Sequence, residues 1–130
     1  MRAALLLCLL PLAAAAQDGH HHHGAPRPEG TPPPVFIAST GKPFAGLMED
    51  AMAVMDDGMK WAPMNGQADH DFVTMMIPHH QGAVDMAKAL LLYSQDPELR
   101  NLSLSIIAEQ QNEINLMKAW LERHAAKEKQ

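Results

Sequence analysis

Two adjacent histidines follow two adjacent methionines in residues 75–80, which read Met-Met-Ile-Pro-His-His. In an α-helix, residues three and four positions apart share a face, so Met76 lies over both histidines and Met75 lies over His79. Thioether sulfur is a soft ligand that selects Cu(I), whereas Ca²⁺ and Mg²⁺ prefer oxygen. The segment therefore predicts a copper site with His79 and His80 as principal ligands and the two methionines as nearby donors.

A second group of methionines precedes this segment at helical spacing. This methionine stripe consists of Met48, Met52, Met55 and Met59. At about 100° per residue its members fall within an arc of roughly 60° on one helix. Methionine often fills irregular gaps in a core, so the stripe is either packing or a second, weaker copper site. The sequence leaves both interpretations open.

Three helices are expected to position these side chains. Pro43 suits the first turn of one helix, and Asp96 with Pro97 supplies the cap and first residue of another. Pro78 lies inside the middle helix, where it predicts a local kink or widening beside the histidines. The expected helices cover about 43–60, 69–93 and 97–125. Short connections make consecutive helices antiparallel neighbours.

The apolar seams of the second and third helices indicate what the histidines face. His79 falls in the seam of the second helix, which continues through Met86. The third seam carries Gln110 and Glu113 in its middle and Met117 one turn later, and polar groups are costly to bury without a partner. Counting from the turn between the two helices places the histidine pair opposite roughly Gln110 to Glu113, so a histidine can meet the glutamate. We therefore predict an inter-helix site in which this carboxylate orients a metal-bound imidazole, although a metal-free ion pair fits the same pattern.

Residues 1–16 have the organisation of a secretory signal peptide, with Arg2, a short apolar run and a small-residue end at Ala16. Cleavage near Ala16 predicts a periplasmic or secreted protein. The run is too short to span a bilayer, so no membrane anchor is expected. The one cysteine, Cys8, would leave with the signal, so no disulfide is expected after processing.

Residues 17–42 are rich in histidine, proline and glycine, which predicts a disordered arm before a single helical domain at 43–126. The tract His20 to His23 has metal-binding side chains but no fixed geometry, so its role stays open. Removal of the signal changes the formal charge from −5 to −6, because it takes away one arginine and no acid. This balance argues against a nucleic-acid partner.

Enzymatic chemistry has little support in the sequence. Di-iron centres in helical bundles use Glu-x-x-His pairs, and this chain has Met76-x-x-His79 at that spacing instead. Nucleophile-elbow and glycine-rich phosphate motifs are absent. We predict a protein that is not an enzyme. The alternatives are a ferritin-like metal-dependent redox enzyme and a structural or interaction bundle without metal.

The residue order resembles that of a family of small secreted bacterial domains called only a domain of unknown function (DUF305), which is marked by a His-His pair and assigned to the ferritin-like superfamily. The resemblance rests on Phe-x-x-x-Met-Ile-Pro-His-His-Gln-Gly-Ala-x-x-Met-Ala at 72–87, Asp-Pro-Glu-Leu-Arg at 96–100 and Gln-x-x-Glu-Ile-x-x-Met-x-x-Trp-Leu at 110–121. It implies an all-helical, ferritin-like antiparallel bundle with a functional His79-His80 pair and with Met76, Met86 and Met117 at the family's methionine positions.

Some members of that family are described as periplasmic copper-binding proteins, and some carry the domain twice. This chain has one copy, so a homodimer is one way to complete a full bundle, and the sequence leaves the oligomeric state open. Together with the residues above, the resemblance predicts an exported protein that sequesters or relays Cu(I), and Cu(II) through its histidines, in metal tolerance or homeostasis. Such a protein needs a copper donor or acceptor protein as its partner.

Overall fold

The computed structural model describes residue 27 and residues 29–125, and this part of the chain contains three α-helices and no strand. The helices are α1 (Phe44–Lys60), α2 (Ala68–Tyr93) and α3 (Pro97–Ala125). They agree with the expected helices to within one residue at each end. The predicted signal peptide and the tract His20 to His23 lie outside the described residues.

Carboxylate side chains bind backbone N–H groups at the start of α3 and in the loop before α2. The Asp96 carboxylate accepts hydrogen bonds from two backbone N–H groups in the first turn of α3, at 2.9 and 3.0 Å. The Asp71 carboxylate in α2 accepts backbone hydrogen bonds from Asn65 at 2.8 Å and from Gly66 at 3.0 Å. Gly66 has a φ of +83°, which a residue with a side chain rarely adopts. These bonds fasten the loop between α1 and α2.

The segment before α1 is tied to the helices at two points. Arg27 forms an ion pair with Asp57, and its guanidinium lies 5.9 Å from the ring centroid of Trp61. The hydrogen bond from Arg27 holds the pKa of Asp57 below its ordinary value. The Tyr93 hydroxyl donates to the backbone carbonyl of Lys42. The chain thus contacts both ends of the helical layer before α1 begins.

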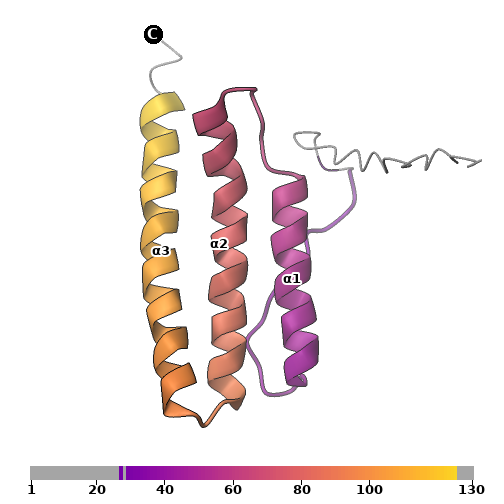
Figure 1. Cartoon of the computed structure of the whole chain (residues 1–130). Helices are drawn as coiled ribbons and strands as arrows, with labels where there is room; N and C mark the ends of the chain where they lie inside the picture. The colour runs from indigo at the N-terminus through magenta and orange to yellow at the C-terminus, as the bar shows by residue number, and fades with distance from the viewer. Residues whose placement is uncertain (1–26, 28, 126–130) are drawn as a thin grey trace, which may run out of the picture.

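Helix α2 lies between α1 and α3 (Figure 1). Both outer helices contact α2, and within the described residues they do not contact each other. The chain runs up, down and up again, so neighbouring helices are antiparallel (Figure 1). The result is a layer one helix thick rather than a closed bundle, and α2 is covered on two sides only.

Helices α1 and α2 approach each other closely at two glycines. A Cβ atom at Gly58 would lie 2.5 Å from Cβ of Pro78, and one at Gly82 would lie 2.8 Å from Sδ of Met55. The Pro78 ring therefore packs where α1 has no side chain. Helix α2 continues through Pro78 as an unbroken α-helix, so the widened turn expected there is not found.

The buried apolar side chains are mostly small and lie at the contacts with α2. They are Leu47, Ala51, Ala62, Val84, Ala87, Ala89 and Ile114. Larger apolar side chains remain partly exposed, which follows from a layer with no covering element on its open sides. None of the helices in the described part of the chain is both long and apolar enough to cross a membrane.

Candidate metal centre

His80 is hydrogen-bonded at both ring nitrogens. Nδ1 donates to the backbone carbonyl of Met76 at 2.9 Å, and Nε2 lies 2.7 Å from Oε2 of Glu113. Because the carbonyl can only accept, Nδ1 is the donor in the first contact, and Nε2 is left to face the carboxylate. A metal ion that binds Nε2 has to displace any proton shared between Nε2 and Oε2.

The contact between His80 and Glu113 joins α2 to α3, as counting from the turn predicts. Its burial differs from the prediction, because the Glu113 side chain is 51% exposed and that of His80 only 12%. Gln110 donates a long hydrogen bond of 3.5 Å to the same carboxylate oxygen. The expectation of a buried glutamate was wrong, since α3 has a single helical neighbour and position 113 lies at the margin of that contact.

His79 is exposed, and its expected place in a buried seam was also wrong. His79 lies on the side of α2 that faces the space between α1 and α3, and these two helices do not contact each other. Its ring centroid lies 5.8 Å from that of His80, with an angle of 62° between the planes. Among residue 27 and residues 29–125, no hydrogen bond engages the His79 ring. This imidazole is therefore available to a ligand from outside.

The α2 methionines share the open side of the helix with His79. At about 100° per residue, Met75, Met76 and Met86 lie within roughly 60° of His79. All three are half-buried. Met117 of α3 is half-buried as well and follows Glu113 by one turn. Met75 and Met76 are thus within about one turn of His79, whereas Met86 lies seven residues, or about 10 Å, further along α2. Of the predicted site residues, the structure brings His80 and Glu113 into direct contact.

The methionine stripe of α1 faces the same side of the layer. Met55 rests on Gly82, one turn after the histidine pair. Met48 lines a groove of about 250 Å³ together with Met86. Three members of the stripe are half-buried, and Met52 is 40% exposed. The stripe is thus neither a fully buried core nor remote from the histidines.

In the described residues, no three His, Cys, Asp or Glu side chains converge in a way that could hold a metal ion. His80 and Glu113 form a pair, and His79 stands beside them. A metal ion held by one copy of the chain would therefore need sulfur donors in addition.

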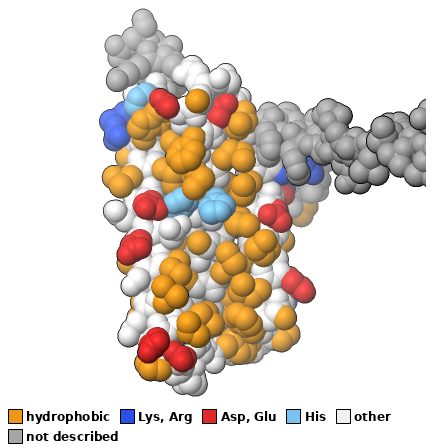
Figure 2. All heavy atoms as spheres, in the orientation of Figure 1, with side chains coloured by type: hydrophobic (Ala, Val, Ile, Leu, Met, Phe, Trp, Pro, Cys, Tyr) orange, Lys and Arg blue, Asp and Glu red, His pale blue; other side chains and the backbone are white. Residues whose placement is uncertain are grey.

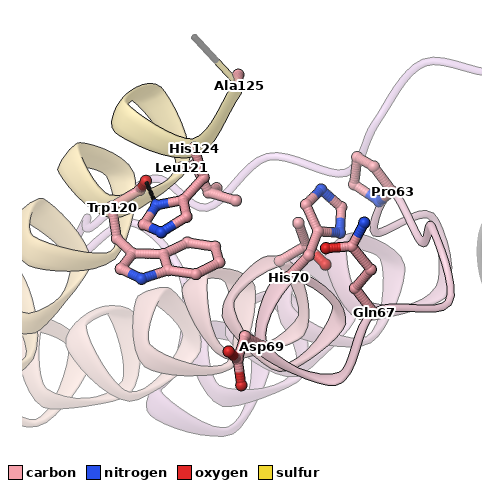
Figure 3. A pocket seen from close by; sticks show the side chains of 9 residues that line it. Pro63, Gln67, Asp69, His70, Trp120, Leu121, His124 and Ala125 are labelled. Atoms are coloured by element: carbon pink, nitrogen blue, oxygen red, sulfur yellow. Dashed lines mark hydrogen bonds between the residues drawn. The ribbon is translucent and has the colours of Figure 1, made fainter. Parts of the chain in front are cut away.

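A separate cavity of about 550 Å³ lies between the start of α2 and the end of α3. His70 and His124 line it from opposite sides (Figure 3). The His124 ring stacks on Trp120 with centroids 3.9 Å apart, and its Nδ1 donates to the Trp120 carbonyl at 2.8 Å. His70 lies 3.1 Å from Asp71. The sequence analysis missed this cavity, because its walls come from helix ends far apart in the chain and form no motif.

A known family and a known protein are each similar to part of this chain. Residues 69–130 match the family described as "Domain of unknown function (DUF305)". An uncharacterized protein of Acanthamoeba polyphaga mimivirus is 38% identical over 61 residues, which cover 47% of this chain and 40% of that protein. The chain thus spans less than half of the length of this relative. The segment matched by the family carries the histidine pair and Glu113, and the match agrees with the resemblance in residue order.

Proposed function

We propose that this protein binds copper, as Cu(I) through histidine and methionine and as Cu(II) through histidine, and sequesters or relays the ion. The observation that carries the proposal is the position of Met55. Its sulfur rests against Gly82, three residues after His79. Thioether from α1 and imidazole from α2 therefore lie on one side of the layer, and this combination of soft and borderline donors suits Cu(I).

Gly82 makes this arrangement possible. A side chain at that position would occupy the space of the Met55 sulfur, since the added Cβ would lie 2.8 Å from it. Residues three apart on a helix have Cβ positions about 5–6 Å apart, so His79 is within reach of this thioether. Methionine has three rotatable side-chain bonds, and its sulfur can turn from Gly82 towards an ion at His79 without backbone motion.

His80 contributes through exchange of a proton for the ion. In the metal-free protein a proton shared between Nε2 and Glu113 neutralises the pair. A copper ion at Nε2 takes the place of that proton, and the Glu113 carboxylate then offsets part of the charge of the ion. Copper binding is thereby coupled to proton release.

Export, a ferritin-like architecture and a role in metal tolerance belong to the same proposal. They are supported by the residue pattern at 1–16 and by the family resemblance. A partner protein would donate or accept the ion. No catalytic step is needed for this role.

A structural bundle without metal is the second candidate function. One observation favours it: both ring nitrogens of His80 already have partners within the protein. In that case the pair with Glu113 fixes α3 on α2, and His79 is a surface residue.

Competition for Cu(I) separates the two functions. The metal-free protein is titrated against a colorimetric Cu(I) chelator, beside a double His79→Ala and His80→Ala variant and a variant lacking residues 20–23. We expect the unmodified protein to remove Cu(I) from the chelator and the double variant to lose this ability. Failure of the unmodified protein to compete would overturn the copper proposal.

A matched pair of methionine variants tests the role of α1. Met55→Leu removes the thioether beside the histidine pair, and Met64→Leu removes one from the loop between α1 and α2, where Met64 is 37% exposed. We expect Met55→Leu to weaken Cu(I) binding about tenfold or more and Met64→Leu to leave it unchanged. Equal affinities of the two variants would remove Met55 from the site.

A further inference from the structure

One face of the three-helix layer is apolar and uncovered. Figure 2 shows hydrophobic side chains spread across this face, histidine side chains in its middle, and Asp and Glu mostly along its edges. We call it the open face and define it by Met48, His79, Met86, Leu90, Leu102 and Ile106. An apolar centre with a polar rim is the usual composition of a protein interface.

A groove of about 250 Å³ runs along the open face between α1 and α3. Its floor is α2, with Met86 and Leu90, and Leu102 on its α3 side is 53% exposed. Contiguous apolar surface of this kind is unfavourable in water and marks a contact site. The groove exists because α1 and α3 leave one side of α2 without a neighbour.

The open face has the size that a stable dimer needs. Helix α2 has 26 residues and is therefore about 39 Å long at a rise of 1.5 Å per residue. Packed helices lie about 8–10 Å apart, so the layer is roughly 20 Å wide between its outer axes. The product is on the order of 800 Å², which equals the area that each partner buries in an interface of standard size.

We propose that a second copy of this chain covers the open face, with the two-fold axis beside His79. Two flat layers then stack with their apolar sides together, which is the ordinary way for packed helices to close a core. His79 lies near the middle of α2, with eleven residues of the helix before it and fourteen after it. In a two-fold interface a residue beside the axis meets its own counterpart, so the two His79 rings face each other.

This arrangement also completes the metal centre, an inference that rests on the proposed function. Within residues 29–125, His79 is the imidazole of the pair that has no hydrogen-bond partner, and no three His, Cys, Asp or Glu side chains converge there. Two copies bring two His79 rings to one place, with thioethers from both chains around them. The copper ion is then held between the copies.

Sedimentation velocity of the metal-free protein tests the dimer, with chelator present throughout. Leu102→Glu places a charge on the open face. Leu104→Glu is its matched control, because the two leucines are 53% and 56% exposed and lie about 200° apart around α3. We expect a dimer for the unmodified protein and for Leu104→Glu, and a folded monomer for Leu102→Glu. A monomeric unmodified protein, or a Leu102→Glu dimer, overturns the proposal.

A disulfide tests the position of the axis. In a Cys8→Ser background, His79→Cys should give a covalent dimer on mild oxidation, because a disulfide forms only when the two Cα atoms are within about 7 Å. Leu104→Cys in the same background should not form a covalent dimer. A dimer that His79→Cys fails to cross-link refutes this axis.

Copper binding is measured separately by chelator competition. A metal-free dimer that does not bind copper refutes the proposed function and leaves the dimer intact. A monomer that binds copper refutes the dimer alone.

Discussion

Replacement of Gly58 by alanine tests the contact between α1 and α2. In a helix, alanine is more favourable than glycine by up to about 1 kcal/mol, so the change would stabilise the protein if space were available. The added Cβ would lie 2.5 Å from Cβ of Pro78. A proline ring cannot rotate away, so the two helices must separate. Such overpacking costs about 1–3 kcal/mol.

The expected net effect is a loss of about 1–2 kcal/mol in the free energy of unfolding. Gly46 provides a matched control in the same helix. An alanine Cβ there would meet the Lys42 side chain at 3.2 Å, and that side chain is exposed and flexible. We expect Gly46→Ala to gain about 0.5 kcal/mol, because only the helix preference acts.

Thermal unfolding followed by circular dichroism measures the difference. For a domain of this size, 1 kcal/mol corresponds to about 4–8 °C, so the two variants should melt roughly 10 °C apart, with Gly58→Ala the lower. All samples need the same protein concentration, because self-association shifts the melting temperature. If Gly58→Ala melts at or above Gly46→Ala, the close approach of the helices at Pro78 is refuted.

Three further predictions concern the centre and the loop before α2. At Gly82 an added Cβ would lie 2.7 Å from Cβ of Met55 as well as 2.8 Å from its sulfur, so Gly82→Ala should lower stability, as Gly58→Ala does, and should also lower Cu(I) affinity in chelator competition. Hydrogen bonds from the Asn65 backbone and from His70 hold the pKa of Asp71 below its ordinary value, so their stabilisation is present above about pH 4 and is lost as the pH falls below it. The free energy of unfolding, measured in urea around and below this pH, should depend less on pH in Asp71→Asn than in the unmodified protein. Copper binding in weak buffer should release about one proton per ion, and Glu113→Gln should abolish this release.

Local sequence signals predicted the helices well. The start of α3 follows from the Asp96 cap and from Pro97, and these act within a few residues. The contact of His80 with Glu113 followed from counting along two antiparallel helices joined by a short turn. Both inferences need only neighbours in sequence and a regular helix.

Burial could not be predicted in the same way. The seam of α2 identifies an apolar side of the helix, but it does not say which element covers that side. His79 and Glu113 are exposed because α1 and α3 pack on α2 without meeting each other. The seating of Met55 on Gly82 was missed for a related reason, since a glycine in a helix does not reveal which side chain of another helix will fill its place.

A copper ion shared by two copies must couple copper binding to dimerisation. An ion that binds only the dimer stabilises it by about 2.7 kcal/mol when its free concentration is one hundred times its dissociation constant, so the dimer should become about one hundredfold tighter. By the same linkage, dilution to monomer should weaken copper binding. Sedimentation equilibrium with and without Cu(I) measures the effect, and His79→Ala should dimerise equally under both conditions. If copper leaves the dissociation constant of the unmodified dimer unchanged, the ion is held within one copy.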